Sequence, residues 1–300
     1  MKNSVADWAL VVVPGVIWGA SFLFIAEGLE ATAPNGVTFI RILIGFLTLS
    51  LFPSARRPVA RADWAGTAAL GVLWFAFPLS MFPFAEQHVS SALTGMLNGA
   101  TPLFVAAVAA FLAGRLPGRG TLMGLIVGFG GAVVMALPAM GGSTSAFGVS
   151  LIVAALFSYG IALNVARPLQ QRNGAIPVVW RALGVALILT APLGLPAVLE
   201  GSWSLRPALA MLGLGAGGTA IATILTATPA GRMGATKASV SAFIIPVVAL
   251  ILGVVVRGEH VAVVSLVGAA ICLFGAAILR DPGMLARRLP RRLVGVGARV

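Results

Sequence analysis

The chain has 300 residues, of which 59% are hydrophobic and only 9% are charged, and its mean hydropathy is +1.03. Because a soluble domain carries roughly 25% charged residues, this composition excludes long water-soluble domains. The formal net charge is +12, but six arginines lie between Arg280 and Arg299, directly after the last apolar segment. Such a cluster is typical of a cytoplasmic tail beside anionic lipid headgroups, and it argues against nucleic-acid binding.

Ten apolar segments divide the chain, and Gly, Pro and charged residues separate them. They fall at about 8–26, 34–52, 65–84, 89–113, 122–138, 147–165, 177–199, 207–227, 236–256 and 261–279. Each is expected to be a membrane-spanning helix, since lipid offers the backbone no other hydrogen-bond partners. The first segment is preceded by a single basic residue, Lys2, and it is too long for the apolar core of a signal peptide. We therefore expect it to be retained as a helix.

Basic residues predict the orientation of these segments. With the N-terminus inside, the cytoplasmic stretches hold 16 of the 20 basic residues, whereas the outer loops hold only Arg206 and Arg257. The remaining two, Arg41 and Arg181, lie within segments. Because basic residues favour the cytoplasmic side, the sequence predicts an all-α integral membrane protein with ten transmembrane helices and both termini in the cytoplasm.

The second half of the chain repeats the first. The residues Pro102, Gly114, Gly124, Gly131 and Ala132 recur 144 positions later, as Pro246, Gly258, Gly268, Gly275 and Ala276. Repetition at a fixed offset marks a duplicated unit, and five helices per unit require the two copies to have opposite orientations. We therefore expect two inverted five-helix repeats, over residues 1–140 and 141–282, followed by a basic cytoplasmic tail over 283–300.

Polar residues near the midplane are candidates for the substrate site. Trp18, Asn98 and Tyr159 each lie about halfway along an expected span, where transporters with repeated halves bind substrate. Thr94 and Thr101 share a helix face with Asn98, and Thr223 lies on a similar stripe in the eighth segment. Such residues line a cavity or bond neighbouring helices; we favour the cavity for Asn98 and leave both roles open for Thr223.

Aromatic side chains complete the predicted cavity. Ser21 and Phe22 share a face with Trp18, while Phe77 and Phe243 come from the third and ninth segments. Prolines within helices remove a backbone hydrogen bond and bend the helix. The predicted hinges are Pro78, Pro102 and Pro246.

Arg41 and Arg181 could both reach lipid headgroups. For Arg41, an ion pair with Glu27, Glu30 or Glu86 is an alternative, and direct substrate contact is the least favoured role.

An ordered set of short motifs resembles the EamA-type transporters of the drug/metabolite transporter superfamily. It comprises Trp18-Gly19-Ala20-Ser21-Phe22, Pro34 with Phe39-Ile40-Arg41, Ala92 with Pro102 and Gly114, and the second copy from Pro246 to Gly258-Glu259. The resemblance covers essentially the whole chain and implies an inner-membrane carrier that exports amino acids or other metabolites by alternating access. Its aromatic-rich helices are similar to those of aromatic amino acid exporters. The family often has an acidic residue where this chain has Arg115, so the resemblance does not imply a symmetric role of that position with Glu259.

The energy source is predicted from what the spans lack. All eight acidic residues fall at helix ends or in loops, so no carboxylate is expected at mid-membrane depth, where a proton or sodium relay usually needs one. The sequence also has no glycine-rich loop with a lysine that would bind a nucleotide. We therefore expect a facilitator driven by the substrate gradient, with a small molecule and lipid as partners and no cofactor or metal. The single Cys272 excludes an internal disulfide.

A channel and a drug or lipid-precursor transporter remain alternative functions, and the chain is expected to be a monomer or a homodimer. A membrane enzyme is disfavoured, since no span contains a cluster of carboxylates or histidines.

Overall fold

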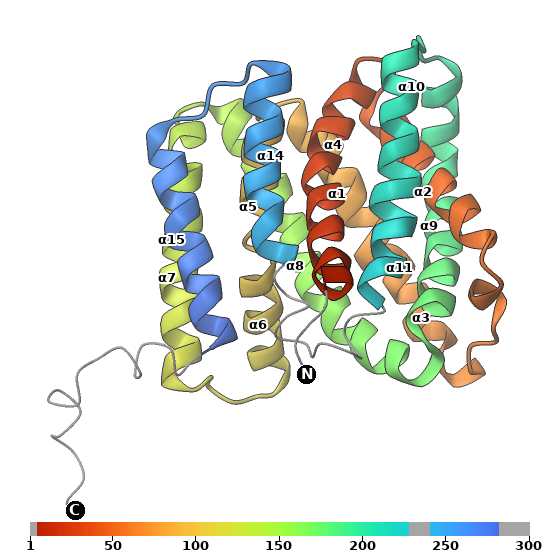
Figure 1. Ribbon diagram of the computed structural model, residues 1–300, viewed down its shortest axis with the longest axis horizontal. Helices are drawn as coiled ribbons and strands as arrows, with labels where there is room; N and C mark the ends of the chain where they lie inside the picture. The colour runs from red at the N-terminus through yellow and green to blue at the C-terminus, as the bar shows by residue number, and fades with distance from the viewer. Residues whose placement is uncertain (1–4, 228–240, 282–300) are drawn as a thin grey trace, which may run out of the picture.

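The structure is a computed structural model that describes residues 5–227 and 241–281, which form helices joined by short connections and no strands. The expected tail over 283–300 and the first residues of the ninth segment lie outside these ranges. Figure 1 shows a bundle of roughly parallel and antiparallel helices. In chain order the elements are α1 (Val5–Leu29), α2 (Pro34–Ser50), η1 (Pro53–Arg56), η2 (Arg61–Asp63), α3 (Trp64–Leu70), η3 (Gly71–Ala76), α4 (Phe77–Glu86), α5 (Ser91–Asn98), α6 (Thr101–Leu112), α7 (Arg119–Ala136), η4 (Leu137–Gly141), α8 (Ser143–Asn173), α9 (Ala175–Leu199), α10 (Leu205–Leu212), η5 (Gly213–Ile221), α11 (Ala222–Ala227), α14 (Ser241–Arg257) and α15 (Val263–Arg280).

The apolar helices fall on the ten predicted segments. Within the described ranges, seven helical stretches are long and apolar enough to cross a membrane, and three apolar helices are shorter: Pro34–Ser50, Ser241–Arg257 and Val263–Leu279. The all-α prediction is confirmed for these ranges, while the number of spans and the sidedness stay predictions.

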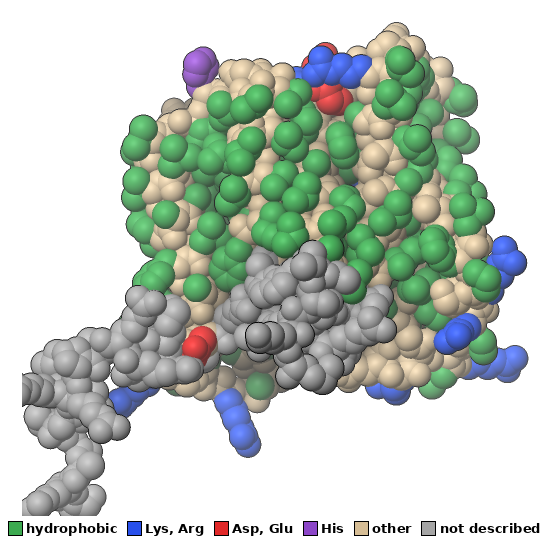
Figure 2. All heavy atoms as spheres, in the orientation of Figure 1, with side chains coloured by type: hydrophobic (Ala, Val, Ile, Leu, Met, Phe, Trp, Pro, Cys, Tyr) green, Lys and Arg blue, Asp and Glu red, His purple; other side chains and the backbone are tan. Residues whose placement is uncertain are grey.

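The surface agrees with a membrane location of these helices. Figure 2 shows apolar side chains over the middle of the visible face and basic side chains at its lower end. Large apolar residues are exposed on several helices, among them Phe111 on α6, Ile188 on α9 and Val255 on α14. An exposed apolar surface of this extent is what a lipid-facing protein requires.

Two segments at matching places in the repeat are π-helical. They are η3 and η5, which interrupt the third and eighth apolar segments. Each packs closely through a glycine: a Cβ added to Gly71 would lie 2.7 Å from Val185 Cβ, and one added to Gly215 would lie 2.5 Å from Ile44 Cβ. η3 therefore packs on α9 as η5 packs on α2, and Gly71 and Gly215 are separated by 144 positions, the offset of the repeat.

The helices α7 and α15 pack through glycines, backbone against backbone. A Cβ added to Gly124 would lie 3.0 Å from Gly275 O, and one added to Gly131 would lie 2.8 Å from Gly268 O. The two helices are therefore antiparallel. Since Gly124 and Gly131 correspond to Gly268 and Gly275 in the repeat, each of these contacts maps onto the other when the two halves are exchanged.

The fourth segment differs from the prediction, because it is two helices instead of one. α5 ends at Asn98 and α6 begins at Thr101. Pro102 has no N–H to donate to Asn98 O, and the Thr101 hydroxyl donates to that oxygen instead, at 2.6 Å. The chain therefore turns at Gly99-Ala100.

The sixth segment is longer than predicted, since α8 runs to Asn173 instead of residue 165. Its polar end is held by Asp63, which accepts hydrogen bonds from Arg172 (2.7 Å) and Asn173 (2.6 Å). Hydrophobicity alone does not report such an extension.

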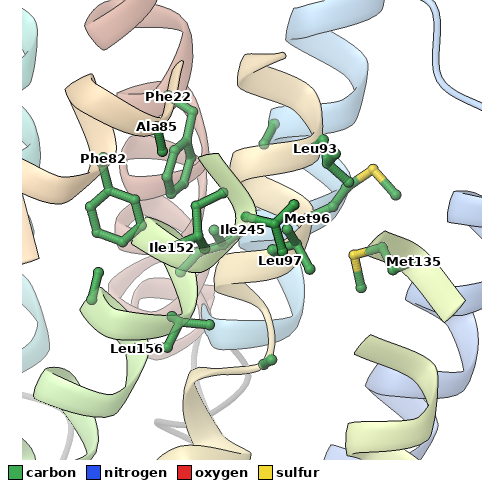
Figure 3. Packing of buried hydrophobic residues seen from close by; sticks show 14 of the residues in the cluster. Phe22, Phe82, Ala85, Leu93, Met96, Leu97, Met135, Ile152, Leu156 and Ile245 are labelled. Carbon is green, nitrogen blue, oxygen red and sulfur yellow. The ribbon is translucent and has the colours of Figure 1, made fainter. Parts of the chain in front are cut away.

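The largest core cluster lies where helices of both halves meet. Figure 3 shows Phe22 of α1, Phe82 of α4, Met96 of α5, Ile152 of α8 and Ile245 of α14 converging. All are at least nine-tenths buried. The core thus positions α1, α4, α5, α8 and α14 around one interior region.

Candidate functional site

Buried polar groups gather around Arg41 on α2. Its side chain lies inside the protein, with the residue only 8% exposed, and Nε donates a hydrogen bond of 3.2 Å to the hydroxyl of Thr219 in η5. Trp18 Nε1 on α1 donates to Gly218 O at 2.9 Å. A Cβ on Gly218 would lie 2.7 Å from Ser21 Oγ and 3.9 Å from Arg41 Nη2. The polar groups of α1 and α2 therefore meet the π-helix of the second half.

The local sequence explains this meeting point. A π-helix is wider than an α-helix and is frequent at functional sites, and η5 lies in a run rich in glycine. Gly215 lets Ile44 and the backbone of Arg41 approach closely, since a Cβ at this position would lie 3.0 Å from Arg41 O. The glycine run thus lets η5 lie close enough to α2 for Thr219 to accept a hydrogen bond from Arg41.

Three aromatic side chains form a continuous wall in the interior. The ring of Phe22 meets that of Phe82 edge-on, with centroids 5.7 Å apart, and Phe82 lies 5.9 Å from the ring of Tyr159. Tyr159 lies close enough to Arg41 for the two side chains to interact electrostatically. This group combines apolar surface with a hydroxyl and a cation.

Glu86, the last residue of α4, directs its carboxylate into the protein. Both of its oxygens are buried, and neither has a hydrogen-bond partner among the described residues. It interacts electrostatically with Arg41, and with Glu259 and Arg257 near the upper end of the bundle. No cation of the described ranges lies within 4.0 Å of it. A buried carboxylate without a donor is costly, which marks this position as a candidate for ligand binding.

Five charged residues form what we call the upper ion-pair cluster: Glu27, Glu30, Arg206, Arg257 and Glu259. Arg257 Nη1 donates to Glu27 (2.9 Å) and Nη2 to Glu30 (3.0 Å), while Arg206 Nη2 donates to Glu27 (2.7 Å). Arg257 Nε lies 4.0 Å from Glu259. Acidic and basic side chains are visible together at the upper edge in Figure 2. The cluster joins α1 to α10 and α14, and so the first half of the chain to the second.

The alternative in which Arg41 forms an ion pair with Glu27, Glu30 or Glu86 is absent from the described structure. The two glutamates near α1, Glu27 and Glu30, have other partners. Both glutamates lie at the upper end of α1 and bond Arg257 of α14, and Glu27 also bonds Arg206 of α10. α1 turns these carboxylates toward the second half of the chain, away from α2.

The remaining predicted polar residues mostly bond their own helix. Thr94 donates to Ser90 O (2.9 Å) and Thr223 to Thr219 O (2.7 Å), while Thr101 bonds Asn98 O across the α5–α6 turn. Asn98 is half-buried at that turn. These bonds satisfy the hydroxyls locally, and lining of a cavity by these residues stays a prediction.

Two predicted aromatics lie apart from Arg41. Phe243 on α14 is half-buried against the core cluster. Phe77 is 40% exposed and lines a groove of about 280 Å³ between α2, α4 and α9 that also includes Thr38 and Thr190. A larger groove, of about 450 Å³, lies between α1, α10 and α14 and includes Glu27 and Arg206 of the upper ion-pair cluster.

The predicted hinge prolines occupy three different settings. Pro78 is the second residue of α4, directly after the π-helix η3, and Pro102 is the second residue of α6. Pro246 is buried inside α14, and a Cβ on Gly99 would lie 2.5 Å from its Cγ. The turn before Pro102 therefore packs against Pro246, its counterpart in the repeat, and bending at these points stays a prediction.

The sequence pointed to Arg41 only weakly and to Glu86 hardly at all. An arginine within a span is a known signal for function, whereas Glu86 stands at a helix end, where carboxylates usually face water. Within the described residues, no three His, Cys, Asp or Glu side chains are placed to hold a metal ion.

Comparison with known proteins relates this arrangement to transporters. The chain is 27% identical over 298 residues to the "Probable terminal-alkyne amino-acid exporter" of Streptantibioticus cattleyicolor, a match that covers 96% of this chain and 97% of the relative. It is also 27% identical to the "Uncharacterized transporter YdfC" of Bacillus subtilis, over 86% of each chain.

A solved crystal structure has the same fold. The TM-score is 0.63 at 20% sequence identity, and the match covers 95% of this chain and 99% of the other. The model of the EamA-like transporter family matches residues 8–137 and again residues 146–280. The chain therefore belongs to the EamA-like transporter family, within the drug/metabolite transporter superfamily, and is a multi-pass membrane transporter.

Proposed function

We propose that this transporter exports amino acids or related small metabolites across the bacterial inner membrane by alternating access. The observation that carries the proposal is that a relative matched over 97% of its length is named a "Probable terminal-alkyne amino-acid exporter". Polar groups of both halves also meet in this chain's interior around Arg41 and Thr219. Substrate sites of transporters lie at the interface between repeated halves.

The proposed architecture is ten spans in two inverted five-helix repeats, over residues 1–140 and 141–282, with both termini cytoplasmic. The reciprocal glycine contacts of α7 with α15 support it, because an in-plane two-fold axis exchanges them. The twofold match of the family model supports the same division.

We propose a substrate site that comprises Trp18, Ser21, Phe22 and Tyr159 together with Arg41, and Asn98 at the α5–α6 turn. The turn before Pro102 packs against Pro246 through Gly99. We propose these two prolines as the hinge at which the two halves move relative to each other during transport.

The first experiment is an export assay in cells fed dipeptides of the common amino acids. Cells that contain the transporter should excrete at least one amino acid faster than control cells do. Trp18→Ala should reduce this export severalfold, because it removes both the indole and its bond to Gly218, while Trp64→Ala should not, because Trp64 is half-exposed at the lower end of α3. Equal export by the transporter and an empty vector would overturn the proposal.

Proteoliposomes separate a carrier from a channel and reveal the energy source. Export driven by the substrate gradient should continue without any ion gradient, and substrate on the opposite side should accelerate it. A strict need for a pH gradient would contradict the facilitator, and flux without acceleration would favour a channel. Competition by lipid precursors but not by amino acids would favour the drug or lipid-precursor alternative.

A further inference from the structure

We propose that Arg41 and Glu86 together bind a zwitterion, with the guanidinium holding the carboxylate of an α-amino acid and the Glu86 carboxylate holding its ammonium group. This inference rests on the proposed function and names the groups that would recognise its substrate.

Both residues carry hydrogen-bonding capacity that the described protein does not use. Arg41 has five N–H donors, and its one hydrogen bond to a described residue is that from Nε to Thr219. The two Glu86 oxygens have none among the described residues. A carboxylate costs several kcal/mol when it is buried unpaired, so a ligand that donates to Glu86 offsets a cost that the protein otherwise bears.

Arg41 and the Glu86 carboxylate both lie inside the protein without forming an ion pair. They interact electrostatically, yet no oxygen of Glu86 lies within 4.0 Å of a nitrogen of Arg41. A direct pair would satisfy both groups and leave no role for a ligand. The observed separation leaves a guanidinium and a carboxylate available to the two opposite charges of one amino acid, whereas an amine or a carboxylic acid could satisfy only one of them.

The surroundings favour an apolar side chain on that amino acid. Phe22, Phe82 and Tyr159 form the aromatic wall, and Tyr159 is its member that interacts with Arg41. The acidic groups near Glu86 are already engaged: Glu259 binds the N-terminus of α5, through the backbone N–H groups of Ser91 and Ala92. Of the three acids Glu27, Glu86 and Glu259, Glu86 is therefore the one whose carboxylate has no hydrogen-bond partner among the described residues.

The test removes one charge at a time from the ligand. Purified transporter in proteoliposomes exchanges the amino acid that the export assay identifies, and the competitors are that amino acid, its methyl ester and its N-acetyl derivative. The ester lacks the carboxylate and the N-acetyl form lacks the ammonium group. Because a hydrogen bond to a charged group contributes about 1.5–3 kcal/mol, each derivative should compete roughly 10- to 100-fold more weakly than the parent. Equal potency of the three compounds on the unaltered protein would overturn the proposal without any variant.

Two variants then assign each charge to its residue. Glu86→Gln should abolish the preference for the parent over the N-acetyl derivative but keep the preference over the ester, and Arg41→Gln should do the reverse. Glu200→Gln and Arg57→Gln remove charges from exposed residues and serve as matched controls. Unchanged preferences in both site variants would show that Arg41 and Glu86 serve another purpose, such as pairing with each other in a second conformation. The absence of any amino-acid exchange by the unaltered protein would instead refute the proposed function.

Discussion

Glu259 shows how one residue can join the two halves of the chain. It follows Gly258, whose φ of 65° directs the chain back from α14, and its carboxylate accepts hydrogen bonds from Ser91 N (3.0 Å), Ser91 Oγ (2.7 Å) and Ala92 N (2.8 Å). These donors are at the N-terminus of α5, where backbone N–H groups lack partners within the helix and a negative charge is favoured. Glu259 therefore supplies from the second half a cap that α5 needs in the first.

We expect Glu259→Ala to destabilise the protein by about 1–3 kcal/mol, because it removes charge-assisted bonds and leaves α5 donors unpaired. The measurement is thermal denaturation of the purified protein in detergent, read as a lower midpoint. Arg115→Ala is the matched control, since Arg115 occupies the equivalent place in the first repeat and is exposed. Equal midpoints for Glu259→Ala and the unaltered protein would show that the cap contributes nothing to stability.

At the scale of elements, the pair α7–α15 depends on residues without side chains. A Cβ on Gly131 would overlap the backbone nitrogen of Cys272, and a Cβ on Gly268 would overlap that of Met135. Close helix packing through small residues is typical of membrane proteins, in which apolar burial does not drive helices together. Neither helix can rotate or separate without losing this contact.

Gly131→Val should therefore force the two helices apart. Overpacking of a core costs about 1–3 kcal/mol, and here the clash is with backbone, which yields less than a side chain. We expect a sharp fall in folded, monodisperse protein by size-exclusion chromatography and a lower denaturation midpoint. The neighbouring Gly130→Val is the control, because a Cβ added there would have no atom within 4 Å. A normal yield for Gly131→Val would mean that α7 and α15 are not fixed at this distance.

The elements also show which features can be predicted from sequence. Apolar runs located the helices because lipid permits few alternatives, and charge counts predicted their orientation. The break at Gly99-Ala100 depends on Thr101 taking over the bond that Pro102 cannot make, and the π-helices depend on packing around Gly71 and Gly215. Such effects involve partners distant in the chain, and hydrophobicity does not encode them.

The candidate site was harder to predict for the same reason. Trp18 and Tyr159 are predicted from their depth in a span and Ser21 from the helix face that it shares with Trp18, but the inward turn of the Glu86 carboxylate is a matter of side-chain direction at a helix end. Likewise, Arg41 meets Thr219 across 178 positions of sequence. Without the positions of the neighbouring helices, nothing in the sequence favours substrate contact for Arg41 over a lipid headgroup.

At the scale of the whole molecule, the upper ion-pair cluster holds α1 against α10 and α14. Alternating access requires the halves to separate at one end and close at the other. Below the cluster, Phe22 is only 5% exposed and Ile25 only 1%, so neither side chain is accessible from the end that we propose to face outward. Opening there must break the bonds of Arg257 to Glu27 and Glu30.

Arg257→Gln should therefore shift the transporter toward the state that is open at the upper end. Losing charge-assisted bonds worth about 1.5 kcal/mol or more should raise the population of that state roughly tenfold. The measurement is the rate at which a membrane-impermeant maleimide, added outside intact cells, modifies Phe22→Cys. We expect slow modification in the otherwise unaltered protein and roughly tenfold faster modification with Arg257→Gln.

Two exposed positions calibrate the sidedness of the assay: His260→Cys should react from outside, and Leu116→Cys only after permeabilisation. Reaction of Leu116→Cys in intact cells would contradict the proposed orientation, whereas equal rates for Phe22→Cys with and without Arg257 would show that the cluster does not control opening.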